Sequence, residues 1–286
     1  MSDFLATWSL FWPSFLAGWV IAALLAVVGV WVVARREIFL GAAVSQASTL
    51  GIALAISLGA ASGAHWLESD GVAAALAIAA AVATALVSAR GGGPGRESAE
   101  GIVGWIFLLA ASLPTLLLAH SPHGLEEIHR LAFSTLLGAQ PADLAVLGVL
   151  LAATLLAARR FRDPLLLLAL DAETAAALGV PRGRLVVGAA IWLGVCVGFS
   201  MRVSGMLYAF GCLVLPTLVA RRLARESRPL VWLAPAIALA AALLGFVLAH
   251  VSDVPPAQMA VTLLCGMLAA AWVFGLLRSH RDADSG

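Results

Sequence analysis

Long apolar runs separated by short polar connectors fill the chain. A helix needs about 20 apolar residues to cross the hydrocarbon core of a bilayer, and nine runs approach that length. The pattern therefore predicts an all-α fold, a polytopic transmembrane helical bundle with about nine spans. The runs cover residues 11–34, 39–61, 72–89, 101–119, 143–158, 185–200, 205–220, 230–250 and 257–277.

The positive charges of the connectors are all arginines, because the chain contains no lysine. With nine spans, all but Arg130 and Arg202 of the 17 arginines fall on one side of the membrane. The positive-inside rule makes that side cytoplasmic. We therefore expect the N-terminus outside and the C-terminus in the cytoplasm. An even number of spans would scatter the same arginines over both sides.

Composition supports the membrane class. Hydrophobic residues make up 62% of the chain and charged residues 12%, which excludes an ordinary soluble domain. The first ten residues carry only Asp3 as a charge, so a cleaved signal peptide is not expected. Cys196, Cys212 and Cys265 lie in apolar runs, where they are expected to be small buried side chains rather than disulfide or metal ligands.

The glycine-rich connector 91–95 superficially resembles a phosphate-binding loop. A P-loop uses a lysine to contact the phosphates, and this chain has none. No serine–histidine–acid or paired-carboxylate arrangement stands out within the spans either. The sequence therefore favours a non-enzymatic protein without its own nucleotide-binding site.

A short surface helix is predicted in the connector near residues 163–184. Asp171 can cap its start and Glu173 lies in its first turn, where the helix dipole favours a negative charge. Gly179 and Pro181 are typical of a helix end. The segment is either a plain connector or a surface helix that inserts into a groove of a partner protein.

Two spans contain more polar or helix-interrupting residues than the others. The second span carries Ser45, Gln46 and Thr49, and the seventh carries Tyr208 and Pro216. Such residues serve either helix packing or an aqueous path through the bundle. Paired irregular segments in the two halves of a chain are typical of a transporter site. On the second interpretation these five residues line the translocation pathway.

Four segments resemble the zinc/manganese (type 3 metal) family of ABC transporter permeases, in order and over nearly the full length. The resemblance implies a type II ABC importer permease-like fold, one domain over residues 1–286, in the bacterial cytoplasmic (inner) membrane. The segments are ARREIFLGAAVSQASTLGIAL from Ala34, LALDAETAAALGVPRGRL from Leu168, SGMLYAFGCLVLPTLVARRLA from Ser204 and LLGFVLAHVSDVPPAQMAV from Leu243.

The resemblance also implies partners and a mechanism. Two copies of the permease would form a homodimer, with a separate ABC ATPase subunit docked on each cytoplasmic face. A periplasmic or lipoprotein solute-binding protein would dock outside. Asp171, Glu173, Ala177 and Gly179 would belong to the coupling helix that transmits ATP-driven closure. The chain itself would bind no cofactor, since ATP is on the partner subunit, and the cargo would be a divalent metal ion, zinc or manganese.

One departure from the family concerns the cargo. The second span of these permeases usually carries an aspartate and a histidine, one turn apart, that contact the metal. Ala42 and Gln46 occupy the matching positions, and an amide is a poor ligand for zinc or manganese. A metal chelate or another small solute is therefore an alternative cargo. A heterodimer with a paralogue that retains both ligands is an alternative assembly.

A third interpretation is a stand-alone secondary transporter or a membrane scaffold. It is disfavoured by the lack of acidic or basic residues within the predicted spans.

An outer connector provides other candidate metal ligands. His120, His123, Glu126 and His129 are side chains of the types that bind zinc, although their spacing fits no fixed site. Histidines at a membrane interface are also often merely solvated. We expect this loop to gather or pass metal at the outer mouth of the permease.

Overall fold

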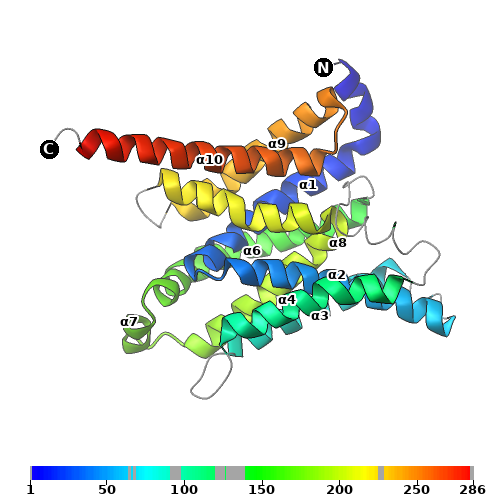
Figure 1. Cartoon of the computed structure of the whole chain (residues 1–286), viewed down its shortest axis with the longest axis horizontal. Helices are drawn as coiled ribbons and strands as arrows, with labels where there is room; N and C mark the ends of the chain where they lie inside the picture. The colour runs from blue at the N-terminus through cyan, green and yellow to red at the C-terminus, as the bar shows by residue number, and fades with distance from the viewer. Residues whose placement is uncertain are drawn as a thin grey trace.

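The computed structural model describes residues 2–63, 66, 69–90, 98–119, 126, 139–224 and 229–283. Eight of the described helices are long and apolar enough to cross a membrane, and only α7 is short. Figure 1 shows the long helices arranged as one bundle. The helices are α1 (Ser2–Ala34), α2 (Ile38–Ser62), α3 (Asp70–Arg90), α4 (Ala99–Leu118), α6 (Pro141–Leu170), α7 (Ala172–Ala177), α8 (Arg182–Leu223), α9 (Leu230–Ser252) and α10 (Pro256–Ala283).

The helix α8 contains two of the predicted spans. Gly205 interrupts it with φ 76° and ψ 167°, a conformation that is essentially restricted to glycine. The first arm, residues 182–204, runs antiparallel to α3, because Gly194 lies against Val82 and Gly198 lies against Ile78. It therefore crosses the bundle in one direction and ends at Gly205.

The second arm of α8, residues 206–223, returns alongside α1. The hydroxyl of Tyr208 donates to the backbone oxygen of Gly18 at 2.9 Å. Further along both helices, Nη1 of Arg221 donates to the oxygen of Val33 at 3.5 Å. The two arms therefore run back and forth across the bundle, and the described helices make nine passes, as the sequence predicts.

The two ends of the bundle differ in charge. One end carries the turn with Arg35 and Arg36, the last residues of α3, the helix α7 and the pair Arg221 and Arg222. We call it the arginine-rich end. In Figure 1, α7 and the last turns of α10 lie on the left, whereas α1 begins on the right. The first and last helices thus start and finish at opposite ends of the bundle.

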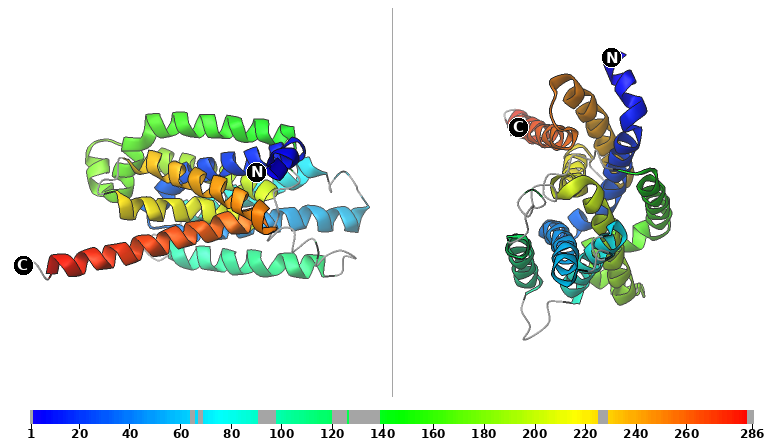
Figure 2. Two further views of the ribbon diagram at one scale, coloured as in Figure 1. Left: turned by 90° about the horizontal axis from the view of Figure 1, so that it is seen from above. Right: turned by 90° about the vertical axis from the view of Figure 1, so that its right-hand side faces the viewer.

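The centre of the bundle consists of α1, α2 and α8. Over its most apolar 18 residues α1 is 78% buried, whereas the corresponding stretch of α6 is 11% buried. In Figure 2, viewed along the bundle, α6 and α4 lie at its margins. The central helices approach closely through glycine, and Gly29 of α1 lies directly against the backbone of Leu213 in α8.

Three expectations differ from the structure. The fifth span was expected to end at residue 158, but α6 continues through Pro164 to Leu170. The proline leaves one carbonyl of the preceding turn without its helical donor, and water can bind that carbonyl where the helix emerges from the membrane. The helix α1 begins at Ser2, well before residue 11. Cys265 is exposed, unlike Cys196 and Cys212, because α10 lies at the edge of the bundle.

Candidate coupling segment and translocation face

The helix α7 begins at an aspartate that also ends α6. The backbone N–H of Asp171 donates to the oxygen of Leu167 at 2.8 Å. Its carboxylate accepts the hydroxyl of Thr174 and the backbone N–H groups of Thr174 and Glu173, the last two at 3.0 and 3.1 Å. These hydrogen bonds, the Thr174 hydroxyl first, lower the pKa of Asp171. The predicted N-cap is confirmed.

The end of α7 is equally well defined. Gly179 has φ 73°, the left-handed conformation that ends many helices. Its N–H donates to the oxygen of Ala176, and the N–H of Val180 donates to the oxygen of Ala175, both at 3.0 Å. The helix end predicted at Gly179 is therefore confirmed.

One face of α7 is held against the bundle by a small apolar cluster. Ala175 of α7 is buried there with Leu168 of α6 and Val186 of α8. Ala89, in the last turn of α3, packs against the same cluster. Because α6 is about 45 Å long and the hydrocarbon core is about 30 Å thick, its end extends beyond the membrane and positions α7 at the arginine-rich end.

The opposite face of α7 is exposed. Glu173, Ala177 and Gly179 all lie on it, as does the capping Asp171, so the structure brings the four predicted coupling residues together on one short segment. Leu178 is 68% exposed beside them. Sequence reasoning missed this leucine, although an apolar residue just before the terminating glycine could have indicated it. A single exposed apolar side chain is common on protein surfaces, so this leucine by itself does not define a contact.

The predicted pathway residues of α2 are largely inside the bundle. Ser45 is fully buried and donates to the oxygen of Gly41 at 2.9 Å. Thr49 donates to the oxygen of Ser45 at 3.3 Å and lies 3.8 Å from the sulfur of Met201. Both hydroxyls are thus satisfied within one copy of the chain, which favours helix packing for these two side chains.

The two predicted pathway residues of α8 are also buried. Tyr208 is 1% exposed and bonds to α1 through its hydroxyl. Pro216 is buried next to Thr217, whose hydroxyl lies 3.5 Å from the oxygen of Ala26. These contacts hold the second arm of α8 against α1. Their role in a pathway stays a prediction.

A different face of α2 is open. Ala42 and Gln46 lie one turn apart and are both partly exposed, while Ala43, Ser45 and Ala47 around them are buried. We call this partly exposed strip the open face of α2. It contains an amide but no carboxylate or imidazole at these two positions.

A metal site cannot be assembled from the described part of the chain. Among those residues no three histidine, cysteine, aspartate or glutamate side chains are placed to hold an ion. His120, His123 and His129 lie outside the described residues, and Glu126 is described and exposed. The predicted outer metal-gathering loop therefore stays a prediction.

The structure pairs two charges that sequence reasoning left apart. Arg202, near the end of the first arm of α8, donates to the carboxylate of Asp143 in the first turn of α6. The same carboxylate accepts the backbone N–H of Gln140 at 3.0 Å and completes a capping box. The pair lies at the end opposite α7. Two opposite charges near the same end of consecutive predicted spans could have suggested it.

Comparison with known proteins identifies the class. A family model described as "ABC 3 transport family" matches residues 8–275. The solved structure "PsaBC from Streptococcus pneumoniae in complex with Fab" is similar over 95% of both chains, with a TM-score of 0.78 and 19% identity. "An inward-facing conformation of a putative metal-chelate type ABC transporter" covers 91% of this chain and 85% of that chain, with a TM-score of 0.71 and 19% identity. No curated protein matches in sequence.

These matches define a membrane-spanning permease of an ABC transporter. The chain belongs to the ABC 3 transport family, so it is a transport subunit, and the predicted family and all-α bundle are confirmed. Membership implies a separate ATPase subunit and a substrate-binding protein as partners.

Proposed function

We propose that this permease imports a divalent metal ion, zinc or manganese, across a bacterial inner membrane, driven by an ATPase subunit that binds α7. The observation that carries the proposal is the exposed face of α7. Asp171 fixes its start, Gly179 fixes its end, and Leu178 projects between them. A short capped helix that packs against the bundle on one face transmits a movement of the ATPase to the membrane helices better than a flexible loop would.

The charges support an orientation of the permease in the membrane. The arginine-rich end would be cytoplasmic by the positive-inside rule, which places α7 on the side where ATP is available. The start of α1 and the Asp143–Arg202 pair would face outside, where a solute-binding protein delivers cargo. Two copies of the chain would then form the pathway between them, with the open face of α2 directed toward it.

A metal chelate is the second candidate cargo, and one observation favours it. The open face of α2 carries Ala42 and Gln46, and an amide can hydrogen-bond an organic ligand but coordinates zinc or manganese weakly. A paralogous partner subunit that supplies the missing ligands would instead preserve transport of the bare ion.

The test is ATP hydrolysis by the reconstituted complex of permease, ATPase and solute-binding protein. Zinc or manganese, supplied as salts, should stimulate hydrolysis and accumulate inside vesicles. Stimulation by a metal chelate alone would support the second cargo. Hydrolysis indifferent to metal salts and to chelates would contradict metal transport altogether.

The proposed coupling role of α7 is tested by substituting two exposed leucines at the arginine-rich end. Leu178→Ser should weaken copurification of the ATPase, because Leu178 is the large apolar side chain on the exposed face of α7. Leu223→Ser is the matched control, since Leu223 is 63% exposed at the end of α8. An equal effect of both substitutions, or of neither, would count against docking on α7.

A further inference from the structure

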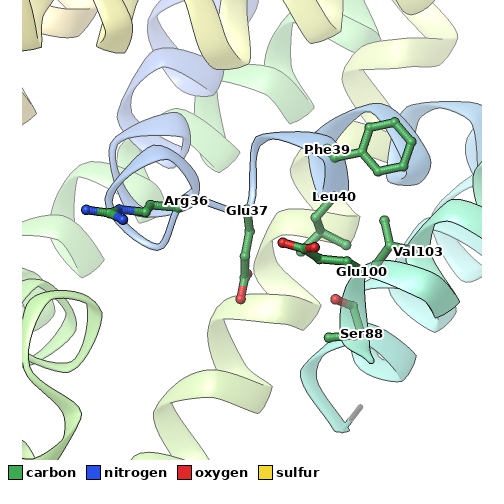
Figure 3. A pocket seen from close by; sticks show the side chains of 8 residues that line it. Arg36, Glu37, Phe39, Leu40, Ser88, Glu100 and Val103 are labelled. Atoms are coloured by element: carbon green, nitrogen blue, oxygen red, sulfur yellow. The ribbon is translucent and has the colours of Figure 1, made fainter. Parts of the chain in front are cut away.

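A pocket of about 240 Å³ opens at the arginine-rich end, where the turn between α1 and α2 meets the end of α3 and the start of α4. Its polar lining includes the carboxylates of Glu37 and Glu100 and the hydroxyl of Ser88, and its apolar lining includes Phe39, Leu40 and Val103. Figure 3 shows Glu37, in the turn between α1 and α2, and Glu100, in α4, at the pocket. None of these residues has a role in the function proposed above.

The pocket is acidic on its inner side. Both Nε and Nη2 of Arg35 donate to the same oxygen of Glu37, at 2.9 and 2.6 Å, which leaves the second carboxylate oxygen able to accept. The guanidinium of Arg36 points away from the pocket (Figure 3). Glu100 makes no ion pair with any residue in the part of the chain that the structure describes. The free acceptors therefore attract a cation.

Ser88 adds a buried polar group without a protein partner. Its residue is 7% exposed, and its hydroxyl is directed toward Glu100 and the pocket (Figure 3). No hydrogen bond joins this hydroxyl to another described residue, and its oxygen is not among the fully enclosed polar atoms without a partner. The hydroxyl therefore opens into the pocket that Ser88 lines, where an occupant with a donor would bond to it.

The pocket adjoins the surface where the ATPase is proposed to bind. Ser88 lines the pocket, and its neighbour Ala89 packs against the cluster that holds α7. The last turn of α3 thus separates the pocket from α7. The pocket and α7 therefore lie on either side of the same helix end.

We propose that the pocket receives an arginine or lysine side chain of the ATPase subunit, as a second docking point beside α7. The aliphatic stem would lie on Leu40 and Val103, and the cationic group would bind Glu37 and Glu100. The apolar walls favour a long side chain over a bare ion, and the described residues contain no set of three ligands for a metal. This inference rests on the proposed ATPase partnership.

The experiment measures the affinity of the purified ATPase for the permease in detergent at several salt concentrations. The double substitution Glu37→Gln and Glu100→Gln should weaken binding about tenfold and flatten its salt dependence, because a charge pair desolvated on binding is lost. Asp163→Asn is the matched control, an exposed acidic residue at the same end but outside the pocket. It should bind like the wild type.

A photo-cross-linking residue in place of Ala99, which also lines the pocket, gives a second measurement. Mass spectrometry of the cross-linked complex should locate the adduct beside an arginine or lysine of the ATPase, and changing that residue to glutamine should weaken binding as much as the double substitution does. A cross-link only to other segments of the permease itself would overturn the proposal.

The remaining outcomes distinguish failure of the pocket proposal from failure of the proposed ATPase docking on α7. Unchanged affinity of the double variant, with wild-type binding intact, overturns the pocket while the docking on α7 stands. Unchanged affinity with impaired metal uptake also overturns it and assigns the pocket to the exit of the cargo. If the wild-type permease binds no ATPase, the proposed function fails first, and the pocket proposal fails with it.

Discussion

Replacing Gly29 by alanine tests the central contact of the bundle, between α1 and the second arm of α8. An added Cβ would lie 1.7 Å from the backbone oxygen of Leu213 and 2.8 Å from its carbon. Because non-bonded heavy atoms need about 3.5 Å, the two helices must separate by well over 1 Å. The hydroxyl of Thr217, already 3.5 Å from the oxygen of Ala26, would then lose its acceptor.

The expected cost combines two terms. Overpacking of a close contact costs about 1–3 kcal/mol, and a lost hydrogen bond costs about 1 kcal/mol, so Gly29→Ala should destabilise the permease by about 2–4 kcal/mol. The matched control is Gly104→Ala in α4, where the new Cβ meets no atom within 4 Å. Alanine is the better helix former by about 1 kcal/mol, so the control should melt at or above the wild-type temperature.

Thermal unfolding of the purified permease in detergent measures both variants, with ligand-free protein at equal concentration. We expect Gly29→Ala to melt at a clearly lower temperature than the wild type, and Gly104→Ala to melt at the wild-type temperature or above it. Equal melting temperatures for the two variants would refute the close approach of α1 to α8.

Three further substitutions probe the ends of the bundle and its periphery. Gly179→Ala should cost about 1 kcal/mol at its positive φ and lower ATP hydrolysis by the reconstituted complex; full hydrolysis would argue against α7 as the coupling element. Asp143→Asn should reduce the free energy of unfolding by about 3 kcal/mol, seen as a lower melting temperature, because it leaves the partly buried charge of Arg202 without its partner. The exchange of these two residues should recover part of the loss, and no recovery would mean that the site depends on more than the pair. Thr154→Val should reduce the free energy of unfolding by about 1 kcal/mol, because the indole N–H of Trp192 loses its acceptor, the Thr154 hydroxyl. Thermal unfolding measures this, and an unchanged melting temperature would contradict the hydrogen bond.

The sequence predicted the parts of this fold that follow from hydrophobicity, charge and helix-end chemistry. The positions of the spans follow from the cost of placing polar backbone and charges in lipid. Asp171 and Gly179 delimit α7 through local hydrogen bonds and backbone conformation, so neighbouring residues alone contain that information. The extension of α6 beyond residue 158 was missed because the expected span ended with the apolar run, before Arg159 and Arg160, whereas the helix continues past these charges and through Pro164.

Contacts between distant segments could not be read from the sequence. The charges of Arg202 and Asp143 fall near one end of consecutive spans, which suggests a pair, but only the structure shows that the first arm of α8 ends beside the start of α6.

The buried position of Ser45 and the partial exposure of Gln46 illustrate the same limit on one helix. Both residues are polar and adjacent, yet the first bonds within its own helix and the second lies on the open face. The packing of α3, α4 and α8 against α2 determines which of them is enclosed. A polar residue in a span therefore indicates a functional helix more reliably than it indicates a functional side chain. We propose Ala42 and Gln46 as the residues of this helix that meet cargo, because they are partly exposed where their neighbours are buried.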